Sequence, residues 1–258
     1  MGLIFDIRAA RLYESWYKSP KGKLLDTFFE SLVPTLMEPR QGEKVLDIGC
    51  GSGNQLLCLS KLALDIYGID ASPYMISLAR ERLGNRCSLK TGMAEDLPFE
   101  DNEFDVALLV NSLEFIDDPV EALREAARVT KRKIFIVALN SLSFGCLAGK
   151  MHGLIGKSIM NHARPYSLWG LKKYIRTALG NVPIEWECSR TWPFHSGTGF
   201  GRFLRQMSLD RCLMGSLIGI SATIKYTVKT NNVPLKVSIG KTRESVIGGI
   251  NFERSLPL

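Results

Sequence analysis

The chain has 258 residues, 45% of them hydrophobic, so it can bury one sizeable core and we expect one domain. Its six cysteines include no C-x-x-C pair and no metal-ligand spacing, which disfavours a zinc site and favours reduced thiols. The net charge of +7 is uneven: residues 1–140 hold 17 Lys/Arg and 21 Asp/Glu, whereas residues 141–258 hold 16 and 5.

Nothing in the chain predicts export or a membrane span. The first residues include Asp6 and early arginines and lack the apolar core of a signal peptide. The apolar stretch 142–160 is interrupted by Lys150 and Lys157, and the run 213–220 is far shorter than the ~20 residues that cross a bilayer. We expect a cytoplasmic protein, with peripheral contact to a membrane left open.

An apolar stripe over residues 23–37 predicts a first core helix. From residue 44 onward, short β-branched runs alternate with stretches of helical period, which predicts a parallel sheet covered by helices on both faces. Strands are expected at Lys44–Ile48, 65–69, 88–90, Phe104–Val110 and 133–139. Capping residues and period place helices at 72–83 and 118–129. Later segments predict a helix at Leu168–Leu179 and strands at 184–191 and 222–228.

A glycine-rich loop follows the first predicted strand. Gly49–Gly53 contains three glycines, which let the backbone approach a ligand closely. A dinucleotide-binding loop would carry its third glycine at position 54 or 56, where Asn54 and Leu56 stand. The Gly-Lys-Ser/Thr triplets at 156–158 and 240–242 lack the upstream glycine of a phosphate loop. A nicotinamide dehydrogenase and an ATP or GTP hydrolase are therefore both disfavoured.

Two carboxylates stand at the ends of consecutive predicted strands. Asp47 lies two residues before the first glycine, where it favours a ligand with an ammonium or sulfonium group over one with a pyrophosphate. Asp70 follows 23 residues later, where an acidic side chain can accept hydrogen bonds from both hydroxyls of a ribose. The alternative for Asp70 is a surface turn residue. The D-x-G-x-G-x-G string and this spacing together indicate a nucleoside-bearing cofactor with a positive charge.

The segments that follow complete a set of motifs. Asp47–Gly53, Asp70, 94–99 and 111–119 match, in order, the motifs of class I S-adenosylmethionine-dependent methyltransferases. Over about residues 10–140 the sequence resembles the group that includes the ubiquinone and menaquinone biosynthesis methyltransferases (methyltransferase type 11). The resemblance implies an α/β fold, with a Rossmann-like, seven-stranded, mostly parallel sheet and helices on both faces.

From this resemblance, taken with the length of the chain, we expect one methyltransferase domain over residues 1–258. Within it we expect an N-terminal lid and first helix at 1–40 and a cofactor-binding core at 41–140. An acceptor-specific insertion, the remaining strands and a basic tail would occupy 141–258.

By the same resemblance, the cofactor is S-adenosylmethionine and its product is S-adenosylhomocysteine. The positions expected to bind it are Asp47, Gly49, Cys50, Gly51, Asp70, Ala71, Met75, Met93, Ala94, Glu95 and Asn111. One of them departs from the family, because many relatives carry an acidic residue where Met93 stands. Recognition of the adenine would then rest on backbone groups, Glu95 and apolar contact. No metal is expected.

Catalytic residues are harder to assign. Glu114 could act as a base toward the acceptor, or it could be a solvated structural group beside two aspartates. His162 is a second candidate, and like His152 and His195 it follows the fifth predicted strand, but a non-catalytic role is commoner for such a histidine. The sulfonium cofactor already carries a good leaving group, so positioning supplies much of the rate and a dedicated base is not required.

The two ends of the chain carry further expectations. Tyr13, Trp16 and Tyr17 precede the first core helix, where they either form a lid over the cofactor or anchor to the core. The basic residues 141–258 fit an anionic membrane surface somewhat better than nucleic acid, because their Lys and Arg lack interleaved aromatics.

Three functions stay open on the sequence. The first is methyl transfer to a small or lipophilic acceptor by in-line displacement. The second is methylation of RNA or protein, and the third, from another class, is a protein that binds S-adenosylmethionine without turnover. No motif encodes the acceptor atom, the oligomeric state or the pathway.

Overall fold

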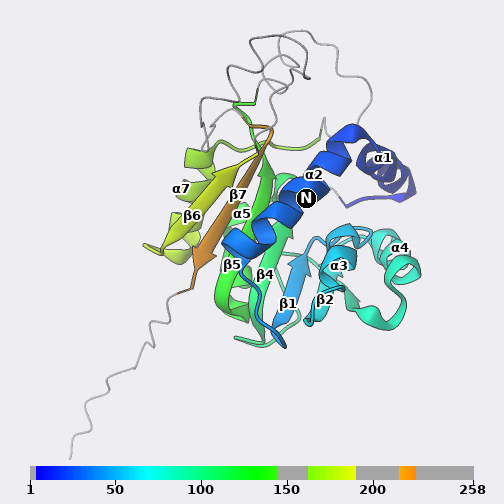
Figure 1. Cartoon of the computed structure of the whole chain (residues 1–258), viewed down its shortest axis with the longest axis horizontal. Helices are drawn as coiled ribbons and strands as arrows, with labels where there is room; N and C mark the ends of the chain where they lie inside the picture. Colours follow the sequence, from blue (N-terminus) through cyan, green and yellow to red (C-terminus); the bar gives the residue numbers. More distant parts are fainter. Residues whose placement is uncertain (1–3, 144–161, 190–214, 225–258) are drawn as a thin grey trace, which may run out of the picture. The chain divides into compact units, whose positions relative to one another are not determined.

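The computed structural model describes residues 4–143, 162–189 and 215–224, and its centre is one seven-stranded sheet. The strands are β1 (Lys44–Ile48), β2 (Asp65–Asp70), β3 (Ser88–Thr91), β4 (Phe104–Val110), β5 (Thr130–Leu139), β6 (Ile184–Cys188) and β7 (Leu217–Thr223). Their order across the sheet is β3-β2-β1-β4-β5-β7-β6. Strand β7 runs antiparallel to β5 and β6, and the other paired strands are parallel. The sheet confirms the predicted Rossmann-like fold (Figure 1).

Helices pack on both faces of this sheet (Figure 1). They are α1 (Ile7–Tyr17), α2 (Pro20–Leu32), the π-turn η1 (Val33–Met37), α3 (Asn54–Leu59), α4 (Pro73–Leu83), the 3-10 turns η2 (Gly84–Arg86) and η3 (Leu113–Phe115), α5 (Pro119–Val129) and α7 (Leu168–Leu179). One core lies under α5 and α7 and contains Leu46 and Ile48 of β1. The other lies under α2, α3 and α4 and contains Val45. Because both faces are buried, the central strands are continuous apolar runs.

The helices on either side of the site begin at the predicted capping residues. Ser72 Oγ accepts a hydrogen bond of 3.2 Å from the Met75 N–H, and Pro73 takes the first position of α4. The Asp118 carboxylate accepts from two backbone N–H groups, both at 3.0 Å, at the start of α5. These caps fix where the loops at the carboxyl ends of β2 and β4 give way to helix.

Two predicted elements have other bounds in the structure. The helix predicted over 23–37 ends at Leu32 and continues as the wider turn η1, because Pro34 donates no N–H and its ring crowds the preceding turn. The strand predicted at 222–228 lies earlier, at Leu217–Thr223, and its Gly219 weakens the β pattern. A Cβ at Gly219 would lie 2.2 Å from Leu32 Cδ1, so the glycine lets α2 approach the sheet.

Several predictions lie outside the described residues. They are the ends of two predicted strands, at 190–191 and 225–228, the insertion after residue 143, and the basic tail. The division of residues 1–258 into lid, core and insertion therefore stays a prediction. Within the described residues, no helix combines the length and apolarity that crossing a bilayer requires.

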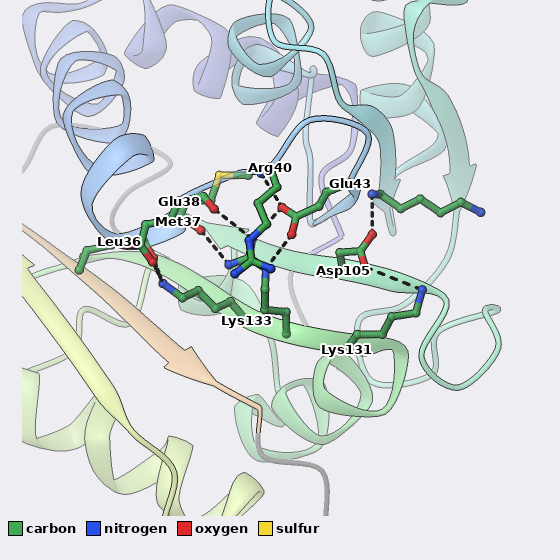
Figure 2. A network of polar contacts seen from close by, with 10 residues as sticks. Leu36, Met37, Glu38, Arg40, Glu43, Asp105, Lys131 and Lys133 are labelled. Atoms are coloured by element: carbon green, nitrogen blue, oxygen red, sulfur yellow. Dashed lines mark hydrogen bonds and ion pairs between the residues drawn. The ribbon is translucent and has the colours of Figure 1, made fainter.

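A network of ion pairs joins the amino ends of the central strands to the segment after α2 (Figure 2). Arg132 of β5 donates two hydrogen bonds of 2.7 Å to the Glu43 carboxylate, just before β1. The Lys133 amine donates to the Leu36 carbonyl at 3.0 Å and pairs with Glu38. These contacts hold η1 at the amino ends of the strands. The polar groups considered next lie at the carboxyl ends.

Candidate functional site

A pocket opens outside the carboxyl ends of β1, β2 and β4. The chain passes from β1 out to β2 and β3 and then returns to β4, so the strand order reverses between β1 and β4, where open α/β sheets bind ligands. Nine predicted cofactor positions line the pocket: Gly49, Gly51, Asp70, Ala71, Met75, Met93, Ala94, Glu95 and Asn111. Other lining residues were not among the predicted cofactor positions, including Ile4, Phe5, Ser112, Phe115 and Ile116.

The loop after β1 is held by its glycines and by Asp70. Gly49 has a φ of +73°, a left-handed conformation that favours glycine. A Cβ at this position would lie 2.4 Å from the Ser112 Cβ, so the glycine allows the ends of β1 and β4 to meet. The Asp70 carboxylate accepts hydrogen bonds of 2.8 Å from the N–H groups of Gly51 and Ser72. The end of β2 thereby fixes both the loop and the start of α4.

Two buried carboxylates lie beside this loop. Burial raises the pKa of Asp70, and its two backbone hydrogen bonds oppose that rise. Each Asp70 oxygen can accept a further hydrogen bond, and the residue lines the pocket. Burial, and then the charge of Asp70, raise the pKa of Asp47 to about 8. Neither Asp47 oxygen accepts a hydrogen bond from the described residues.

More unpartnered polar groups lie where β4 ends. Asn111 is buried with a φ of +49°, and its amide oxygen and nitrogen have no hydrogen-bond partner among the described residues. The same holds for the buried hydroxyl of Ser112. A buried polar group left without a partner costs about 1–3 kcal/mol. Together with Asp47, these side chains present donors and acceptors that a polar ligand would satisfy.

Asp47 and Cys50 are the two predicted positions that are absent from the pocket wall. The Cys50 thiol is buried in the core under α2, α3 and α4, and that burial raises its pKa. Cys50, which the sequence predicts to bind the cofactor, therefore does not present its side chain to the pocket. Asp47 lies in β1, two residues before Gly49, and burial, followed by the charge of Asp47, raises the pKa of the lining residue Tyr13.

Glu114 is buried, so the solvated role considered for it is wrong. Its Oε1 accepts a hydrogen bond of 2.6 Å from the Leu139 N–H, which joins the loop after β4 to the end of β5. Burial raises its pKa to about 7. His162 is exposed, and neither catalytic candidate lines the pocket. His152 and His195 lie outside the described residues, and within those residues no group of side chains could hold a metal ion.

The N-terminal segment contributes to the pocket wall. Tyr13 of α1 and Phe5 line it, with their rings edge to face at 5.8 Å, and Phe5 meets the ring of Phe115 at 5.1 Å. Glu14, on the next position of α1, pairs with Arg82 of α4 at 2.9 Å. Of the three N-terminal aromatic residues, Tyr13 lines the pocket, whereas Trp16 and Tyr17 pack against the buried clusters, and a lid over the cofactor stays a prediction.

Known proteins identify the family of this core. Residues 46–137 match the family described as a methyltransferase domain. The chain carries a class I S-adenosylmethionine-dependent methyltransferase domain. Demethylmenaquinone methyltransferase from Staphylococcus carnosus is 37% identical over 100 residues, which make up 37% of this chain and 42% of that protein. The chain thus spans less than half the length of this curated relative.

Solved structures share the fold of the methyltransferase domain. A methyltransferase from Thermotoga maritima, described as a possible histamine N-methyltransferase, is 24% identical with a TM-score of 0.59, covering 83% of this chain and 94% of that one. The cyclase SpnF is also 24% identical, with a TM-score of 0.57, covering 77% and 81%. Because one of these is named a cyclase, the fold by itself does not define the reaction.

Replacing Gly49 should separate backbone strain from the close contact of β1 with β4. Gly49→Ala introduces both a strained φ and a clash with Ser112, whereas Gly42→Ala introduces the strain alone, at a φ of +80° with nothing within 4 Å. We expect Gly42→Ala to lower the free energy of unfolding by about 1 kcal/mol. Gly49→Ala should lose about 1–3 kcal/mol more. Equal losses in urea unfolding would show that the Ser112 contact is unimportant.

Proposed function

We propose that this protein transfers the methyl group of S-adenosylmethionine to a small or lipophilic acceptor. The observation that carries the proposal is a set of buried polar groups at the carboxyl ends of β1 and β4 that have no hydrogen-bond partner among the described residues, in a methyltransferase domain. These groups belong to Asp47, Asn111 and Ser112, which lie in or directly behind the pocket wall.

The residues present fit this cofactor. Its ammonium group suits the unpaired carboxylate of Asp47, either in contact or through water. Its carboxylate could accept hydrogen bonds from the Asn111 amide and the Ser112 hydroxyl. Asp70 retains acceptor capacity for the ribose hydroxyls, and the apolar residues that line the pocket after β3 suit an adenine ring. Cys50 has no part in this assignment.

The bound cofactor would supply an activated methyl group on a positively charged sulfur. The part of the protein is then to bind, orient and exclude water. Phe5 and Tyr13 line the pocket, and the hydrogen bonds to Asp70 keep the glycine loop in position. Because Glu114 and His162 do not line the pocket, we assign no general base, and positioning would carry the rate.

A lipophilic acceptor has two lines of support. The matching relative from Staphylococcus carnosus is named for demethylmenaquinone. The pocket wall nearest the N-terminal segment and the loop after β4 is apolar, with Ile4, Phe5, Phe115 and Ile116. The rival functions are methylation of RNA or protein and cofactor binding without turnover. The cyclase SpnF, which shares this fold, is named for a reaction other than methyl transfer.

Binding of S-adenosylhomocysteine should release a proton from Asp47. The free protein holds Asp47 protonated below a pKa of about 8, whereas a bound ammonium group favours the carboxylate. Affinity should therefore rise by about tenfold per pH unit between pH 6 and 7, below the range where the ligand's own amino group titrates. Calorimetry at several pH values measures this dependence.

Two variants identify the group responsible. Asp47→Asn should bind more weakly and lose the pH dependence. Glu114→Gln should keep it, although the pKa of Glu114 is also raised, to about 7. A slope in Asp47→Asn as steep as that of the unaltered protein would rule out Asp47 as the titrating group.

Methyl transfer itself is tested with labelled S-adenosylmethionine and fractionated lysate. We expect the label in solvent-extractable material, insensitive to nuclease and protease, and lost in Asp70→Ala, which removes both the ribose acceptor and the support of the glycine loop. Label in RNA or protein would favour the corresponding rival. Cofactor binding with no label in any fraction would favour a protein without turnover.

A further inference from the structure

The outer face of α1 has an unusual composition for a solvent-facing helix. The inner face buries Ala10 and Tyr13 against the pocket and α4. The outer face carries Ile7 and Leu12, whose exposed fractions are 54% and 39%. Ile4, just before the helix, is also exposed. Among the described residues, half of the six exposed large hydrophobic side chains therefore lie between residues 4 and 12.

The charges around these apolar side chains are mostly positive. Arg8, Arg11 and Lys18 are exposed, and none of them forms an ion pair among the described residues. Glu14, the acidic residue of α1, turns inward to Arg82 and away from this face. Asp6 is exposed too, but its carboxylate caps the helix by accepting from the Ala9 N–H at 2.7 Å. The outer face thus combines apolar side chains with unpaired cations.

We propose that the outer face of α1 docks on the surface of an anionic lipid bilayer. Apolar side chains flanked by Arg and Lys on one helix face suit the boundary between acyl chains and headgroups. Each cation near an anionic surface adds about 1 kcal/mol of attraction. Single-stranded nucleic acid fits less well, because it is bound by exposed aromatic platforms. The aromatic rings of α1 instead pack against one another, Tyr13 on Trp16 and Trp16 on Tyr17.

The position of α1 gives this docking a consequence for the pocket. The same segment that presents Ile7 and Leu12 outward contributes Ile4, Phe5 and Tyr13 to the pocket wall. A bilayer held against α1 would therefore lie beside the pocket, where a lipophilic molecule could enter without crossing bulk water. The sequence placed membrane contact in residues 141–258, whereas the described residues point to the N-terminal helix.

The test is co-sedimentation of the full chain with vesicles, in the absence of any methyl donor. We expect binding to vesicles of phosphatidylglycerol and phosphatidylcholine, weakened by salt, and little binding to phosphatidylcholine alone. The double variants Ile7→Ser/Leu12→Ser and Arg8→Gln/Arg11→Gln should each bind at least tenfold more weakly. Leu62→Ser is the matched control and should bind normally: Leu62 is 41% exposed but lies just before the amino end of β2, whereas the pocket lies at the carboxyl ends of the strands.

Thermal unfolding and binding of S-adenosylhomocysteine should be unchanged in all three variants, because the altered side chains are exposed and do not line the pocket. Undiminished vesicle binding by Ile7→Ser/Leu12→Ser would overturn the proposal. Tighter binding to single-stranded RNA than to anionic vesicles would overturn it as well. Neither result bears on methyl transfer, because the assay measures docking alone.

Discussion

The meeting of β1 and β4 at their carboxyl ends is the constraint on which the site depends. Gly49 can lie against Ser112 only because it has no Cβ, and its left-handed φ turns the chain into the loop that follows. The next strand out reinforces this geometry, since Asp70 holds the N–H of Gly51. The pocket is therefore built from backbone whose shape is set before any ligand enters, which reduces the entropy cost of binding.

Electrostatics gives this rigid frame its selectivity. The carboxyl group of Asp47 is buried without a hydrogen-bond partner among the described residues. Its pKa is raised because burial disfavours the charged form. A carboxyl group whose pKa is higher in the folded than in the unfolded protein binds protons more tightly when folded, so it lowers stability as pH rises from about 4 to about 8. A ligand that brings a positive charge offsets this loss and stabilises the folded state.

The sequence predicts the parts of this arrangement that rest on local chemistry. Glycine spacing, the carboxylates at strand ends and the Ser72 and Asp118 caps each have a short-range cause, and the structure brings them to the predicted places. The sequence could not predict contacts that depend on packing between distant elements. Cys50 faces the core because Gly68 of β2 leaves room for its sulfur, and Glu114 is buried because it bonds to the end of β5. Gly219 is unfavourable for a strand by local propensity, and the reason for it is the close packing of Leu32 of α2.

Titration calorimetry can test directly whether the carboxyl ends of β1, β2 and β4 hold a nucleoside with a positively charged amino-acid group. The whole chain should be titrated separately with S-adenosylhomocysteine and with NAD under the same conditions. We expect saturable binding of S-adenosylhomocysteine at one site, and none of NAD, because Asn54 and Leu56 stand where a dinucleotide loop needs glycine. Tight binding of NAD with no binding of S-adenosylhomocysteine would contradict it.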